Sequence, residues 1–139
     1  MVTAVDTNVL SALLIGGPEE SAAARDVLTA AARSGELVIS PIVYAELRAA
    51  PRGTEAEVGV FLSSLRVEVV WTVGEGVWRD AAAAFSAYAA RRRVRHDGMP
   101  KRFLADFLVG AHACWLKCRL LTFDQGKYRA AFPELELVP

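Results

Sequence analysis

Four acidic residues stand at positions from which their carboxylates could hold a metal ion. Asp6 and Asp124 each follow a short β-prone segment. Asp106 lies near the start of an apolar segment that is predicted to be helical, and Glu46 lies in the second turn of another predicted helix. Acidic side chains are seldom buried without a partner, and carboxylates that converge in an apolar cleft repel one another. A divalent ion would resolve that conflict, and carboxylate oxygens with water suit Mg²⁺ or Mn²⁺.

The same acids also have an ordinary structural interpretation. Asp6 and Asp124 could be turn residues at strand ends. Asp106 could complement the dipole of a helix start, and Glu46 could face solvent from its helix. Spacing alone does not prove that the carboxylates meet, so both interpretations stay open on the residues alone.

The elements that must position these acids alternate between strand and helix. The predicted strands are Val2–Val5, Leu37–Ile39, Val67–Trp71, Leu120–Phe123 and Leu135–Val138. The predicted helices are Val9–Leu14, Ser21–Arg33, one that begins at Pro41, Glu55–Leu65, Gly76–Arg95, Phe103–Lys117 and Gly126–Ala131. Because parallel neighbours need crossover connections, the alternation predicts an α/β fold with a parallel sheet covered on both faces. Ligands of such sheets bind at the carboxyl ends of the strands, the edge expected to carry Asp6 and Asp124.

Composition favours one soluble domain over residues 1–139. The chain is 53% hydrophobic and 23% charged, which suits a buried core and not a disordered chain. Its 16 basic residues equal its 16 acidic ones, so net charge does not argue for a nucleic acid or a membrane. The longest nearly apolar run, 107–116, falls short of the ~20 residues that cross a membrane, and no signal peptide is evident. We therefore expect a cytoplasmic protein in which Cys114 and Cys118 are reduced, buried thiols.

One stretch is locally basic. Between 91 and 102, six cations face the single acid Asp97, and they lead directly toward Asp106. The six are Arg91, Arg92, Arg93, Arg95, Lys101 and Arg102. They could position RNA phosphates beside the acids, because such contacts fix register and affinity. They could equally be a solvated helix end, whose dipole favours cations.

Other side chains that could take part in catalysis or binding are expected to serve packing instead. His112 follows Asp106 by six residues, which turns it away from the carboxylate face of a helix. The aromatic residues Trp71, Trp78, Phe85, Tyr88 and Trp115 could stack on bases, but their spacing with apolar neighbours favours a core or an interface.

Four segments together resemble the PIN-domain ribonuclease family, and specifically its VapC toxins from prokaryotic toxin–antitoxin pairs. They are Val5–Leu10, Ile39–Leu47, Ala105–Ala113 and Leu121–Asp124, and their order and spacing agree with the family pattern over essentially the whole chain. Each segment alone is a weak signal, but four in order are specific. Two departures, Asp106–Phe107 in the third segment and a long basic region, leave the acids intact and bear on the substrate.

The resemblance implies a three-layer α/β/α fold with a central, mainly parallel five-stranded sheet. It implies that Asp6, Glu46, Asp106 and Asp124 are metal-binding and catalytic, with Asn8 and Thr122 as supporting polar residues. It further implies Mg²⁺ or Mn²⁺ as cofactor, RNA as substrate, a homodimer, and a cognate antitoxin. The chain is accordingly expected to be the endoribonuclease toxin of a type II toxin–antitoxin system.

Cleavage at such a site needs an activated water and relief of charge on the phosphate, both of which a bound metal can supply. Asp6, Asp106 and Asp124 are expected to contact the metal, and Glu46 either holds a second ion or orients the water. Two alternatives remain. A phosphotransfer enzyme disagrees in detail, because aspartyl phosphatases need an acid where Asn8 stands; a non-cutting binding module disagrees with the intact acids.

Overall fold

The computed structural model describes residues 1–95 and 103–139, and it is built on one parallel sheet. Five strands lie in the order β3-β2-β1-β4-β5, and every neighbouring pair runs parallel. The strands are β1 (Val2–Val5), β2 (Glu36–Ile39), β3 (Val67–Val69), β4 (Arg119–Leu121) and β5 (Leu137–Val138). The expected α/β class and five-stranded parallel sheet are confirmed.

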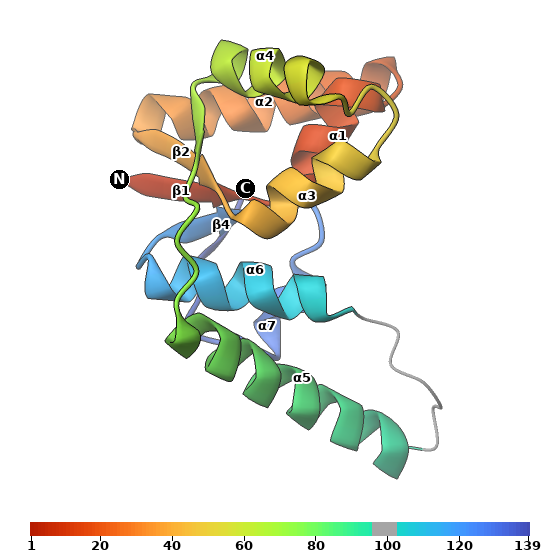
Figure 1. Cartoon of the computed structure of the whole chain (residues 1–139), viewed down its shortest axis with the longest axis vertical. Coiled ribbons are helices and arrows are strands. Elements are labelled where there is room, and N and C mark those ends of the chain that lie inside the picture. The colour runs from red at the N-terminus through yellow and green to blue at the C-terminus, as the bar shows by residue number, and fades with distance from the viewer. Residues whose placement is uncertain (96–102) are drawn as a thin grey trace.

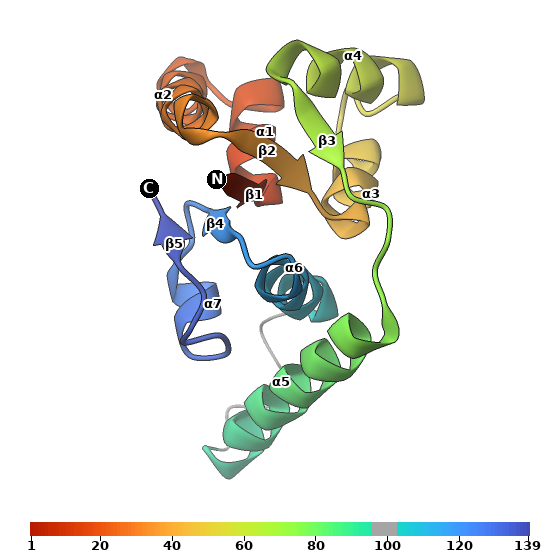
Figure 2. The same cartoon turned by 90° about the vertical axis from the view of Figure 1, so that its left-hand side faces the viewer.

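Helices cover the sheet on both sides. They are α1 (Thr7–Ile15), α2 (Pro18–Ser34), α3 (Pro41–Ala49), α4 (Glu55–Leu65), α5 (Glu75–Val94), α6 (Leu104–Trp115) and α7 (Gly126–Arg129). Figures 1 and 2 show α1 and α2 on one side of the sheet and α6 on the other, with α5 packed outside α6. Helix α3 begins where its sequence predicts: the Ser40 hydroxyl accepts the Ile42 N–H at 3.3 Å, and Pro41 occupies its first position. Helices α1 and α2 begin two and three residues before the predicted Val9 and Ser21.

The central strand β1 sets the edge at which the acids can meet. It pairs with β2 through Thr3 and Leu37 and with β4 through Val5 and Leu121. Its last three residues are buried, as a parallel strand covered on both faces requires. Because all five strands run the same way, the residues that follow β1 and β4 emerge at one edge of the sheet.

Three strands are shorter than predicted. The segments expected as 67–71, 120–123 and 135–138 form ladders only over 67–69, 119–121 and 137–138. β3 is an edge strand with one neighbour, and after Val69 only the Val70 N–H still reaches the sheet, at the Ile39 carbonyl. The chain then turns away from the sheet toward α5. The β propensity of residues 67–71 does not predict where the strand ends.

The tryptophans do not lie in the core, whereas an interface for them stays a prediction. Trp71, Trp78 and Trp115 are 62%, 49% and 57% exposed. Trp71 lies edge-on to the Tyr44 ring, and the Trp115 indole N–H donates to Asp80 at 2.8 Å, so each is anchored at the surface. Phe85 and Tyr88 do pack as predicted, with both rings against Phe107 of α6.

Helix α6 is the interior helix of the fold. Its residues from Phe107 to Ala113 are all buried, and at Gly110 a side chain would collide with the Phe132 ring. His112 is buried as expected, and Cys114 and Cys118 are free thiols. Within 1–95 and 103–139, no helix is long and apolar enough to cross a membrane.

Burying His112 should make stability depend on pH. Burial lowers the pKa of His112 below its ordinary value of 6.5, against a smaller opposite effect of a hydrogen bond to the Thr72 backbone. The ring Nε2 has no hydrogen-bond partner among the described residues. Because the unfolded chain protonates first, unfolding takes up a proton below pH 6.5. The free energy of unfolding should then fall by up to about 1.4 kcal/mol per pH unit.

Urea unfolding between pH 5 and pH 7.5 measures this slope. In His112→Asn the slope should flatten, because the amide can still donate to the Thr72 backbone but cannot titrate. Equal slopes in wild type and His112→Asn would show that the ring is not held neutral.

Candidate active site

The site begins at Asp6, where β1 passes into α1. The Asp6 N–H continues the ladder by donating to the Leu121 carbonyl at 2.9 Å. The carboxylate then caps α1, because its Oδ1 accepts the Thr7 N–H at 2.8 Å. Asp6 is only 4% exposed, so a charged group is buried at the junction of strand and helix.

Three polar donors surround the second oxygen of Asp6. Oδ2 accepts the Thr122 hydroxyl and the Tyr128 hydroxyl, each at 2.8 Å, and the Asn8 amide at 3.3 Å. Thr122 is fully buried and Tyr128 is 1% exposed. These contacts come from α1, the end of β4 and α7, so the buried carboxylate joins three elements that are distant in the chain.

The same polar residues hold the loop that carries Asp124. The Asn8 carbonyl oxygen accepts the Phe123 N–H, and the Thr122 hydroxyl oxygen accepts the Asp124 N–H, both at 3.1 Å. Asn8 and Thr122 also bond to each other at 3.2 Å. Both residues expected to be supporting therefore touch Asp6 and fix the loop, while the Asp124 side chain remains exposed.

Glu46 approaches from α3. Its Oε1 accepts the Thr7 hydroxyl at 2.8 Å, which ties α3 to the start of α1. Partial burial of the carboxylate raises the pKa of Glu46, the Thr7 hydrogen bond opposes this, and the charges of Asp6 and Asp106 raise the pKa further. The net shift is upward, mainly through burial, and the charges of Asp6 and Asp106 act on Glu46 in the same direction across this edge of the sheet.

Asp106 approaches from the first turn of α6 and meets a cation. Its Oδ1 lies 3.0 Å from the Lys127 Nζ, and the two side chains are 20% and 24% exposed. Burial lowers the pKa of Lys127, but the hydrogen bond and charge of Asp106, with the charges of Asp6 and Asp124, raise it by more. Lys127 is therefore a charged ammonium among the acids.

Lys127 and Tyr128 are the site residues that sequence reasoning missed. They belong to α7, a single turn that begins two residues after Asp124. Burial and the neighbouring Asp6 raise the pKa of Tyr128 far above its ordinary value, so its hydroxyl stays a donor. The available signal was position: a helix directly after a strand-end acid must fold back over the carboxyl edge of the sheet.

The donor set fits a hard divalent cation. Carboxylates of Asp6, Glu46 and Asp106 lie close enough to shift one another's environment, and their oxygens suit Mg²⁺ or Mn²⁺. In the part of the chain that the structure describes, however, no three acidic, histidine or cysteine side chains converge on one point as they stand. A metal would draw the acids together at a position where Lys127 now neutralises Asp106.

The basic stretch lies only partly within the described residues. Arg91, Arg92 and Arg93 form the last turn of α5 and Arg95 follows it, whereas Lys101 and Arg102 fall outside. Arg91, Arg93 and Arg95 are exposed and Arg92 is half-buried. Figure 1 shows this end of α5 on the same side of the molecule as the start of α6, which carries Asp106.

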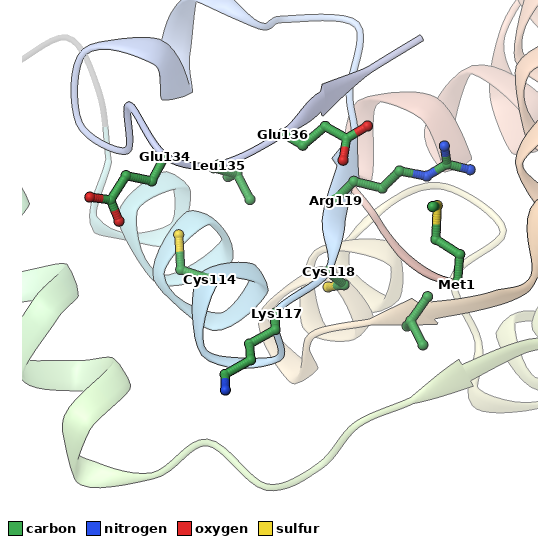
Figure 3. Close-up of a pocket in the computed structure, with 9 residues that line it drawn as sticks. Met1, Cys114, Lys117, Cys118, Arg119, Glu134, Leu135 and Glu136 are labelled. Carbon is green, nitrogen blue, oxygen red and sulfur yellow. The ribbon is translucent and has the colours of Figure 1, made fainter.

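A separate pocket lies at the opposite edge of the sheet. Figure 3 shows it beside the starts of β1 and β4, lined by Met1, Lys117, Arg119, Glu134 and Glu136 together with both cysteines. Two acidic and two basic side chains contribute to its lining. None of the acids described above contributes to it, so it is not part of the carboxylate site.

Comparison with known proteins connects this arrangement to a family. The profile of the PIN domain matches residues 3–133. VapBC2 from Rickettsia felis, bound to a promoter DNA fragment, is similar with TM-score 0.66 and 20% identity over 99% of this chain and 98% of that one. A toxin–antitoxin complex from Klebsiella pneumoniae is similar with a TM-score of 0.62 and 19% identity, over 99% of this chain and 96% of that one. FitAcB from Neisseria gonorrhoeae is similar with a TM-score of 0.59 and 24% identity, over 100% of this chain and 97% of that one. Such identities establish a shared fold; no curated protein matches by sequence.

Removing the Tyr128 hydroxyl should weaken the fold through Asp6. Tyr128→Phe preserves the ring but takes one donor from the buried Oδ2, and we expect a loss of about 1–2 kcal/mol in the free energy of unfolding. Tyr44→Phe is the matched control, because that hydroxyl makes one long contact, 3.5 Å from Arg48, and should cost little. Urea denaturation of both variants decides; equal losses would show that the Asp6 contact contributes nothing.

Proposed function

This chain belongs to the PIN domain family, and from that premise we propose that it is a metal-dependent endoribonuclease, the toxin of a type II toxin–antitoxin pair. One observation carries the proposal. Asp6, Glu46 and Asp106 come from three separate elements to the carboxyl edge of the sheet, close enough for their charges to act on one another. We treat residues 1–139 as a single PIN domain that acts in the cytoplasm.

The metal would be held by Asp6, Asp106 and Asp124, with Glu46 beside it. When bound, Mg²⁺ or Mn²⁺ supplies a water activated at neutral pH and neutralises charge on the phosphate. Asp6 is the fixed member of this set, since four hydrogen bonds hold it. Its Oδ1 accepts only the Thr7 N–H among the described residues, which leaves an oxygen lone pair for a cation.

Glu46 is proposed to orient the attacking water. Glu46 is exposed, so its carboxylate can reach solvent and substrate. The Thr7 hydroxyl donates a hydrogen bond to its Oε1 and restrains the side chain. The raised pKa of Glu46 makes its carboxylate a better proton acceptor than an ordinary glutamate.

A cognate antitoxin is proposed as partner. The similar structure from Klebsiella pneumoniae is a toxin–antitoxin complex, and the fold is shared over nearly the whole chain. A carboxylate cluster at an open sheet edge attracts a basic side chain, so the antitoxin would inhibit by presenting one. We further propose that the toxin is a homodimer.

RNA is proposed to lie along the end of α5. The exposed Arg91 and Arg93 would contact phosphates and guide the strand toward Asp106. Such contacts carry no sequence information, so the identity of the RNA would depend on other parts of the surface.

Glu46→Gln tests catalysis without disturbing the fold. The glutamine amide oxygen can still accept the Thr7 hydroxyl, but the side chain can no longer take a proton. We expect metal-dependent cleavage of total cellular RNA to fall by about 10²-fold or more. Because the folded state raises the pKa of Glu46 above 4.5, its charge disfavours folding at neutral pH, and the variant should melt no earlier than wild type in chelator.

The control is Glu68→Gln, which removes an exposed acid on β3 and should change neither cleavage nor melting. Wild-type cleavage by Glu46→Gln would refute the assignment of Glu46. Absence of metal-dependent cleavage in the wild type itself would refute the proposed activity.

Salt dependence tests the RNA surface. In a Glu46→Gln background, which leaves RNA uncut, Arg91→Ala with Arg93→Ala should weaken binding and reduce the slope of log affinity against log salt by about 0.7 per lost phosphate contact. The matched control is Arg25→Ala with Arg33→Ala on α2, where both residues are exposed. Equal slopes for the two double variants, measured by fluorescence anisotropy, would make the end of α5 an ordinary solvated surface.

A further inference from the structure

Lys127 stands among the acids as a cation that the chain itself provides. We propose that Lys127 competes with the divalent ion for Asp106 and so sets the metal affinity of the site. Lys127 is then a positioning residue that acts on metal loading and not on the reacting atoms. The inference rests on the proposed function, because it assumes that Asp106 is a metal ligand.

The geometry holds Lys127 in place. Its Nζ is 3.0 Å from Asp106 Oδ1, and both side chains are about four-fifths shielded from solvent. The next residue, Tyr128, is 1% exposed and donates its hydroxyl to Asp6, so α7 is fastened to the site at both positions. The Lys127 N–H also donates to the Asp124 carbonyl at 3.3 Å. Lys127 is therefore more restrained than an exposed lysine in a transient surface ion pair.

Charge explains why the ammonium occupies this position. The charged form of Lys127 is favoured by Asp6, Asp106 and Asp124, so one cation compensates the charge of several carboxylates. A divalent ion that takes Asp106 as ligand must displace the ammonium or lie a few ångströms from it. The repulsion between the two cations at that separation is large enough to change affinity about tenfold.

This contact coincides with a spread of the described acids. With Lys127 bound to Asp106, the described acids do not converge on one point. A metal that takes the Asp106 oxygen now bound by Lys127 would have to open this contact. The enzyme would stay unloaded until free divalent ion is abundant enough to displace its own lysine.

Manganese titration tests the competition directly. Free Mn²⁺ is measured by electron paramagnetic resonance against wild type, Lys127→Gln and Lys127→Arg, with Lys117→Gln as a control at the opposite edge of the sheet. We expect Lys127→Gln to bind Mn²⁺ about tenfold more tightly, and the arginine and control variants to resemble wild type. Unchanged or weaker binding by Lys127→Gln would overturn the inference.

A second readout uses the unmodified chain. In wild type, the side-chain ¹³Cε resonance of Lys127 should move when Mg²⁺ is added, while that of Lys117 stays in place. A Lys127 resonance that does not respond at saturating Mg²⁺ would overturn the inference even if Lys127→Gln failed to fold. If neither wild type nor Lys127→Gln binds the ion, the metal dependence of the proposed function falls too; if wild type binds and only the competition is missing, that function stands.

Discussion

The structure depends on how the buried carboxylate of Asp6 is satisfied. A charge that is 4% exposed needs partners, and Asp6 obtains them from the Thr7 backbone, Asn8, Thr122 and Tyr128. These donors lie on α1, after β4 and on α7, so satisfying one acid brings three distant segments to the same edge of the sheet. That requirement explains why the Tyr128 hydroxyl of α7 reaches Asp6 at the end of β1, and it places Lys127 beside Asp106.

The resulting site divides its acids by environment. Asp6 is rigid and hydrogen-bonded on both oxygens, which suits a fixed ligand. Glu46 is exposed with a raised pKa, which suits exchange of a proton with water. Asp106 is neutralised by a lysine of the chain itself, which suits a ligand whose availability is controlled. Three carboxylates of similar chemistry thus differ in environment, because burial, hydrogen bonding and a neighbouring cation differ.

Much of this arrangement follows from local sequence patterns. Alternating strand and helix segments predicted the parallel sheet, and acids placed after strands or at helix starts predicted the edge at which Asp6 and Asp106 lie. Strand ends at Val69 and Leu121 were not predictable, because a ladder stops where its neighbour stops. The tryptophans were misplaced because hydrophobic spacing does not reveal that Trp115 satisfies its N–H at a surface aspartate. Lys127 was not predictable as a site residue, because only its contact with Asp106, 21 residues away in sequence, places it in the site.

The central claim is that these carboxylates gather a divalent ion at the carboxyl edge of the sheet. The most direct measurement is anomalous X-ray diffraction from crystals soaked in Mn²⁺, which locates the ion without reference to activity. The account predicts a peak within coordination distance of carboxylate oxygens from Asp6 and Asp106, with the Lys127 ammonium moved away from Asp106. Ordered Mn²⁺ bound elsewhere, with Asp106 still paired to Lys127 at Mn²⁺ concentrations that support RNA cleavage, would contradict it.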